Sequence, residues 1–152
     1  SILADPRNYD VARVINEQVK NRDFWMPFAP SILHERRNDY IKNPKNFDSF
    51  YMMQSFETHE RARIDLKAAI HPYDFTVRPQ LVTKELNSKY YAILKEFERL
   101  TGVGGVLNTS FNLHGYPIVL GPKEALKAFK NSGLKYLAIE NYLIAKINKI
   151  KV

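Results

Sequence analysis

The sequence predicts an α/β (α+β) protein built on an open, twisted mixed sheet with flanking helices. Short apolar runs with strand composition alternate with amphipathic helical segments, which is typical of open sheets covered by helices. The 152 residues are 45% hydrophobic, which is enough for one sizeable core. The chain contains no internal repeat and no low-complexity linker. We therefore expect one domain over residues 1–152.

The first half of the chain is expected to mix extended segments with short helices. Residues 1–4 are interpreted as a strand end or entry loop, followed by an Asp-Pro-Arg turn. An amphipathic helix is expected from Asn8 or Asp10 to Val19. Prolines interrupt the apolar residues 24–33, which predicts a buried extended segment. Further expectations are a short helix over 35–40, a polar loop over 42–48, a short strand over 51–53 and a mobile loop or helical turn over 58–69.

The second half contains the strongest helix signal. Residues 87–100 carry apolar and aromatic side chains at helical spacing, followed by Gly102, and we interpret this stripe as core. A strand is expected over 75–82, with Pro79 favouring an edge or a bulge. The remaining elements are strands over 106–111, 134–139 and 142–147 and a helix over 122–131 that starts with a proline.

Composition narrows the classes of function. The formal net charge of +7 favours anionic partners such as nucleotides, phosphates or RNA, although many of the lysines suit a solvated surface equally well. The absence of cysteine excludes disulfides, thiolate metal sites and a cysteine nucleophile. No run approaches the roughly 20 apolar residues of a membrane helix, and no leader peptide is visible. We expect a cytoplasmic protein without a membrane partner.

Two pairs of polar residues suggest a site for a phosphorylated ligand. Lys20 and Arg22 flank one residue and together could bind one anion, although cations also suit a helix end. Ser110 and Asn112 follow a strand-like run, and in an extended chain they would share one face, with Phe111 turned toward the core. An ordinary turn, in which Ser and Asn bond their own backbone, is the alternative for this second pair.

One cation and one imidazole are further candidates. Arg78 interrupts an apolar strand and must reach solvent, a ligand or a carboxylate such as Asp74. His71 is the histidine best placed for a ligand contact, and the four histidines show no metal-binding spacing. Neither a phosphate-binding G-x-x-x-x-G-K-[ST] motif nor a dinucleotide-binding G-x-G-x-x-G motif occurs.

The order of these segments resembles the C-terminal domain of the nodulation- and antibiotic-type O-carbamoyltransferases. The resemblance covers nearly the whole chain and is carried by Ser-Ile-Leu-Ala-Asp-Pro-Arg at 1–7, Val-Lys-Asn-Arg at 19–22, Pro-Phe-Ala-Pro-Ser at 27–31, Leu-Asn-Thr-Ser-Phe-Asn at 107–112 and Gly-Tyr-Pro-Ile-Val at 115–119. It implies a YrdC-like fold. It also implies that residues 1–152 are part of a longer two-domain protein.

The resemblance further implies an activity. The C-terminal domain would bind ATP, with Mg²⁺, and carbamoyl phosphate, and would form carbamoyl adenylate. A larger N-terminal domain, with an actin-like ATPase fold and a metal site, would transfer the carbamoyl group to a hydroxyl acceptor. YrdC-like proteins share K-x-R and S-x-N signatures, which fall here on the two polar pairs. The implied catalytic residues are Lys20, Arg22, Arg78 and Ser110, the implied substrate-binding residues are Asn108, Asn112 and His71, and no metal ligand is assigned in this chain.

Two positions depart from the pattern of the family. Met26 stands where a basic residue is usual, and Tyr116 stands where glutamate is usual. These changes predict altered substrate binding, lower activity or a divergent role. A non-catalytic module that binds a nucleotide or RNA is therefore the alternative, although no RNA-recognition motif is present. A docking domain for a partner carbamoyltransferase is a third interpretation.

Overall fold

The computed structural model describes residues 1–21, 23 and 26–147. The chain divides into two compact units. The first unit contains the described residues of 1–13 and 22–110, and the second contains those of 14–21 and 111–152. Helix α1 (Tyr9–Ile15) runs from the residues of the first unit into those of the second and continues as a π-helical turn, Asn16–Lys20. The helix expected up to Val19 is thus present, but it is α-helical only to Ile15 and π-helical after that.

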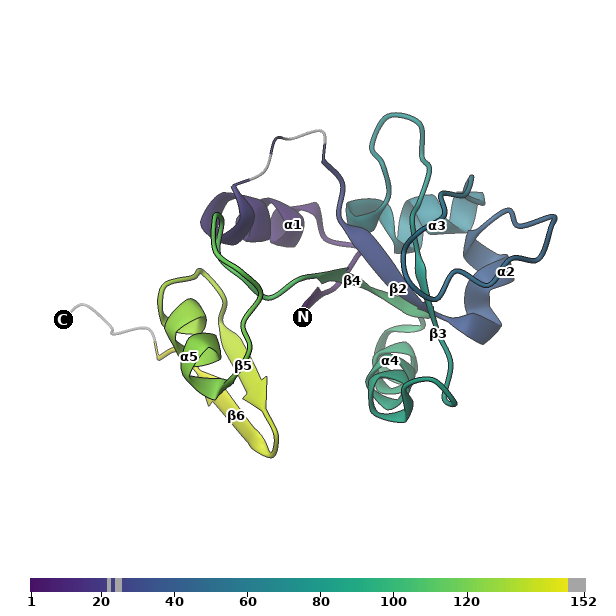
Figure 1. Ribbon diagram of the computed structural model, residues 1–152. Coiled ribbons are helices and arrows are strands. Elements are labelled where there is room, and N and C mark those ends of the chain that lie inside the picture. The colour runs from purple at the N-terminus through teal and green to yellow at the C-terminus, as the bar shows by residue number, and fades with distance from the viewer. Residues whose placement is uncertain (22, 24–25, 148–152) are drawn as a thin grey trace. The chain divides into compact units, whose positions relative to one another are not determined.

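The first unit is built on a four-stranded sheet with the strand order β1-β4-β2-β3 (Figure 1). Its strands are β1 (Ile2–Ala4), β2 (Ala29–Leu33), β3 (Gln80–Val82) and β4 (Gly105–Thr109). Strand β4 is antiparallel to β1 and to β2, whereas β2 and β3 are parallel. The sheet is therefore mixed and open, and the predicted fold class is confirmed.

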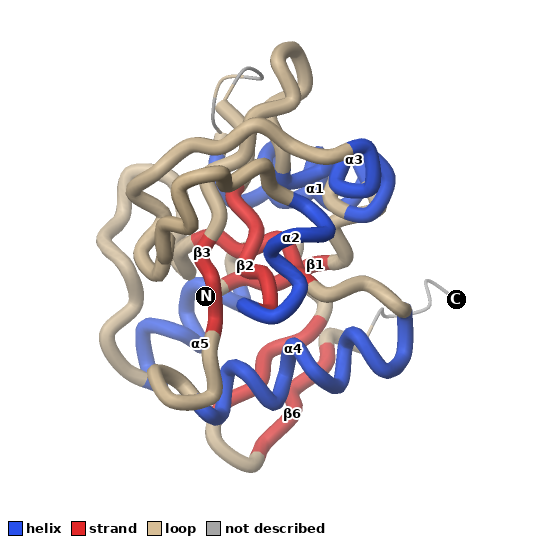
Figure 2. Tube along the Cα trace, turned by 90° about the vertical axis from the view of Figure 1, so that its right-hand side faces the viewer, coloured by secondary structure: helices blue, strands red, loops and turns tan. Residues whose placement is uncertain are grey.

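Helices cover both faces of this sheet (Figures 1 and 2). Helices α2 (Arg37–Tyr40) and α3 (Glu60–Asp65) lie on one side, and α4 (Ser88–Thr101) lies on the other. Successive side chains of a strand point to opposite faces. Accordingly, Ile32 packs in a cluster with Tyr40 and Leu66, while its neighbour Leu33 packs with Leu94 of α4.

Local signals fix the ends of α4. The side chain of Asn87 caps the helix by accepting a hydrogen bond from the Tyr90 N–H at 3.1 Å. Gly102 ends the helix with a φ of +76°, a conformation that costs glycine little. Tyr90, Tyr91 and Phe97 pack against the cluster around Leu94, so the interpretation of this stripe as core is confirmed for these residues. It is wrong for Leu100, at the last turn of the helix, which is exposed.

Three segments differ from the sequence-based predictions. The strand expected over 51–53 is wrong: Tyr51 and Met52 form bends, Met52 has a φ of +56°, and none of the strands in the described residues pairs with this segment. The strand expected over 75–82 is shortened to β3, preceded by a single bridge between Val77 and Phe56. Residues 58–69, expected as a mobile loop or helical turn, form α3 and the 3₁₀ turn Lys67–Ala69.

The second unit contains α5 (Pro122–Lys130) and a hairpin of β5 (Tyr136–Ile139) and β6 (Tyr142–Ala145). Pro122 opens the helix, and the Glu124 carboxylate accepts the Gly121 N–H at 3.1 Å. Phe111, Phe129 and Leu137 are buried. These elements match the helix and the two strands expected over 122–147, with trimmed ends. Within the described part of the chain, every helix is too short or too polar to cross a bilayer.

Candidate functional site

In the second unit, Lys20 directly contacts Asn112. The two residues are 92 positions apart, and the Lys20 Nζ donates a hydrogen bond to Asn112 Oδ1 at 2.7 Å. The Lys20 residue is only 3% exposed. The Asn112 Nδ2 in turn donates to the carbonyl oxygens of Tyr116 at 2.8 Å and Leu113 at 3.2 Å. The lysine of the first predicted polar pair therefore contacts the asparagine of the second pair. The loop that follows Phe111 wraps around this asparagine, because two of its carbonyl groups accept from the Asn112 amide.

Backbone geometry brings this helix end and this loop together. The π-helical turn ends at Asn21, whose φ is +44° and whose N–H donates to the Asn16 carbonyl at 2.6 Å. Asparagine tolerates this left-handed conformation better than most residues. The His114 N–H donates to the Val19 carbonyl at 2.9 Å, and His114 Nδ1 lies 2.8 Å from the Lys20 carbonyl. Because a carbonyl only accepts, this imidazole carries its proton on Nδ1.

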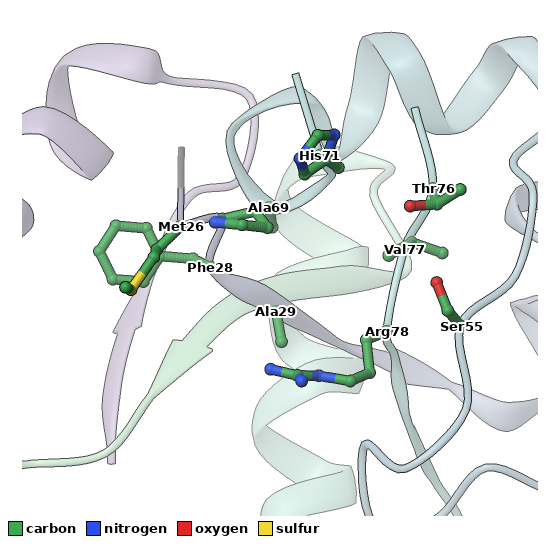
Figure 3. A pocket seen from close by; sticks show the side chains of 10 residues that line it. Met26, Phe28, Ala29, Ser55, Ala69, His71, Thr76, Val77 and Arg78 are labelled. Atoms are coloured by element: carbon green, nitrogen blue, oxygen red, sulfur yellow. The ribbon is translucent and has the colours of Figure 1, made fainter. Parts of the chain in front are cut away.

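In the first unit, a cavity of about 500 Å³ lies beside the start of β2 (Figure 3). Arg78, His71, Ala29 and Met26 are among the residues that line it. Figure 3 shows the Arg78 side chain extending beneath Ala29. The Arg78 side chain is exposed, and it makes no hydrogen bond or ion pair with any residue that the structure describes. Its charge is therefore available to an anion in the cavity.

Asp74, the carboxylate expected as an alternative partner of Arg78, bonds to Thr76 instead. Asp74 Oδ1 accepts hydrogen bonds from the N–H and the hydroxyl of Thr76, each at 2.8 Å. These bonds hold the pKa of Asp74 below its ordinary value. His71 Nδ1 lies 3.1 Å from the same oxygen, so Asp74 orients the imidazole at the cavity wall.

Asn108 belongs to a polar cluster on the sheet. Its Nδ2 donates to Ser31 Oγ at 2.9 Å and to Gln80 Oε1 at 3.3 Å. The Ser31 hydroxyl donates to the same Gln80 oxygen at 2.8 Å. Ser31 is fully buried and Asn108 is 9% exposed. The Asn108 amide is therefore part of a hydrogen-bond network that joins side chains of β2, β3 and β4.

The other predicted residues are placed as follows. Ser110 comes directly after β4 and is half-buried. Arg22 lies outside the described residues. Met26 and Tyr116, the two departures from the family pattern, are both exposed. The described residues contain no group of three or more His, Asp or Glu side chains arranged to hold a metal ion.

Sequence reasoning missed Ser31, Gln80 and His114 as parts of these arrangements. Gln80 lies two positions after Arg78, so strand alternation was the signal that could have indicated a shared face. His114 was interpreted as a loop residue, and nothing local in the sequence shows that its imidazole bonds a helix end.

Comparison with known proteins gives one family. A family model described as "Carbamoyltransferase C-terminus" matches residues 1–146. Uncharacterized protein MJ1058 of Methanocaldococcus jannaschii is 40% identical over 96% of this chain and 24% of its own length. Nodulation protein NolNO of Sinorhizobium fredii is 36% identical over 96% of this chain and 22% of its own length. Nodulation protein NolO of Bradyrhizobium diazoefficiens is 33% identical, over 96% and 27% respectively. The chain thus spans about a quarter of the length of these relatives.

Proposed function

This chain belongs to the carbamoyltransferase C-terminal family, and from that membership we propose that it forms carbamoyl adenylate from ATP and carbamoyl phosphate. The carbamoyl group then passes to a hydroxyl acceptor, which makes the complete protein an O-carbamoyltransferase. The proposal assigns this transfer to an N-terminal domain, because the relatives are about four times as long as the matched segment.

The proposed reaction has two balanced steps before transfer. Water first releases phosphate from carbamoyl phosphate and leaves carbamate. A carbamate oxygen then attacks the α-phosphorus of ATP, forming a new P–O bond while the bond to pyrophosphate breaks. Negative charge develops on the phosphoryl oxygens, and positioned cations stabilise such charge most effectively. Mg²⁺ would arrive on the ATP phosphates and neutralise the leaving pyrophosphate.

Each predicted residue has a role in this scheme. Lys20, Arg22 and Arg78 stabilise the phosphoryl charge, while Ser110 and the two asparagines orient the small carbamoyl group. His71 contacts the acyl phosphate at the wall of the cavity described above. The observation that carries the proposal is the 2.7 Å contact between Lys20 and Asn112, because it joins the two signatures that the family resemblance places around the nucleotide.

ATP–pyrophosphate exchange tests the proposal in the complete natural protein. Exchange should require carbamoyl phosphate and Mg²⁺. The variant Lys20→Met keeps the aliphatic stem but removes the charge, and we expect exchange to fall at least about a hundredfold. Ser110→Ala should lower it as well. The matched control is Lys42→Met, because the Lys42 ammonium is paired with Glu57 at 3.0 Å on the surface and has no role in the proposed reaction.

The exchange rates distinguish the proposed enzyme from a non-catalytic binding module. Exchange at the wild-type level in both Lys20→Met and Ser110→Ala would reject the assigned residues. Binding of ATP or RNA without any exchange would favour the non-catalytic module instead.

A further inference from the structure

One face of the sheet in the first unit changes from apolar to polar along its strands. Leu33, Val82 and Val106 pack against α4. Each of these strands has a polar residue two positions away from its apolar one. On β2 and β3 these are Ser31 and Gln80, which come two positions before Leu33 and Val82. On the antiparallel β4 it is Asn108, which comes two positions after Val106. Because side chains two positions apart share a face, this polar row continues the face that α4 covers.

Hydrogen bonds fix the orientation of the amide in this row. Asn108 Nδ2 donates to both Ser31 Oγ and Gln80 Oε1, and Ser31 also donates to Gln80. The nitrogen end of the amide is therefore held by two acceptors. The other end, Oδ1, is an acceptor that receives no hydrogen bond from any residue that the structure describes. Such a preset acceptor suits a ligand that carries an N–H group.

The same row leads to the cavity of the first unit. The Cα of Asn108 is paired with that of Ala29, which lines the cavity. Arg78 lines it too, and its side chain extends beneath Ala29 (Figure 3). The strand pair that carries the acceptor thus reaches the cavity at Ala29, and Arg78 supplies a cation on the cavity wall. Together they match a small ligand with an amino group at one end and a phosphate at the other.

We infer that Asn108 Oδ1 accepts a hydrogen bond from the amino group of the carbamoyl ligand, and that Ser31 and Gln80 are positioning residues for this recognition. The inference rests on the proposed function and explains how the site would select carbamoyl phosphate over similar acyl phosphates. Acetyl phosphate has the same shape but carries a methyl group in place of the amino group. A site built to bond an N–H group rejects an analogue that lacks it, because the protein acceptor then stays unpaired.

The test is the ratio of exchange rates with carbamoyl phosphate and with acetyl phosphate, measured in the complete natural protein. The ratio separates recognition from general loss of stability, which lowers both rates together. We expect the ratio to fall at least about tenfold in Asn108→Leu and about fivefold in Ser31→Ala and Gln80→Met. Should Gln80→Met fail to fold, Ser31→Ala still decides, since it removes a single oxygen.

Tyr90→Phe is the matched control. It removes another buried hydroxyl beside Ser31, one that makes no hydrogen bond to a described residue, and it should leave the ratio unchanged. An unchanged ratio in Asn108→Leu and Ser31→Ala, with exchange retained, overturns the inference while the proposed function stands. An equal fall of the ratio in Tyr90→Phe also overturns it. Wild-type protein that shows exchange with neither acyl phosphate overturns both.

Discussion

Tyr90 carries a buried hydroxyl that makes no hydrogen bond to a described residue. Burial raises its pKa to about 12. Ionisation of this phenol is therefore easier in the unfolded chain, whose pKa is near the ordinary value of about 10. The neutral phenol therefore contributes to the free energy of unfolding in full below about pH 10. This contribution is lost as the pH rises from about 10 toward about 12.

Tyr90→Phe should remove this alkaline loss. Between about pH 9 and about pH 11, the free energy of unfolding of the wild type should fall by about 1 kcal/mol more than that of the variant. Urea unfolding at the two pH values measures the difference. Tyr73→Phe is the control, since Tyr73 is 90% exposed and its loss should leave the wild-type response intact. Equal losses in the wild type and in Tyr90→Phe would contradict the assignment to Tyr90.

At this scale, the sequence was informative about residue types but not about their partners. The pairing of a K-x-R lysine with an S-x-N asparagine followed from the family resemblance, and the structure brings Lys20 and Asn112 into contact. The catalytic roles of both residues stay predictions. The amide network around Asn108 could not be predicted, because it depends on the register of strands that are far apart in the sequence.

Among the elements, α4 was predicted best because all its signals are local. Its cap, its apolar spacing and its terminal glycine lie within the helix or beside it. The short strand expected over 51–53 had only apolar composition to support it. A strand also needs a partner edge, and composition contains no information about whether one is nearby. The same limit explains why the strand expected over 75–82 is reduced to three residues.

The cap of α4 supports a direct test. Asn87→Ala removes the acceptor for the Tyr90 N–H and should lower the free energy of unfolding by about 1 kcal/mol. Asn87→Asp keeps an acceptor oxygen and should change it by no more than a few tenths. Thermal unfolding of both variants gives the comparison. An alanine variant as stable as the aspartate variant would show that the cap contributes little.

At the scale of the whole molecule, helices pack on both faces of the four-stranded sheet, and each face should contribute separately to the free energy of unfolding. Ile32 and Leu33 are adjacent but pack in different clusters, on opposite faces. Ile32→Ala and Leu33→Ala should each destabilise the protein by about 2–5 kcal/mol, because each opens a cavity in a separate part of the core. Leu100→Ala is the control: Leu100 is 66% exposed, and its removal should cost less than about 0.5 kcal/mol. Denaturant unfolding would refute the two-sided core if either buried variant behaved like the control.

The class of fold could be predicted from the alternation of apolar strands and helices, because that pattern extends along the chain. The strand order could not, since the antiparallel pairing of β1 with β4 is a contact between distant residues. The sequence also gave no sign of the division into two compact units, in which residues 14–21 group with the C-terminal part of the chain. The single domain, the cytoplasmic location and the use of ATP and Mg²⁺ stay predictions.

The pairing of Ile2 with Thr109 has a consequence for biosynthesis. Within the first unit, a ribosome makes β1 before β4, and β4 emerges only after most of that unit has been synthesised. Such long sequence separations slow folding, since loop closure costs entropy before any contact forms. Strand β1 must therefore stay without its β4 partner until residue 109 has been translated, and the pairing of these two strands should be a late event in the folding of this unit.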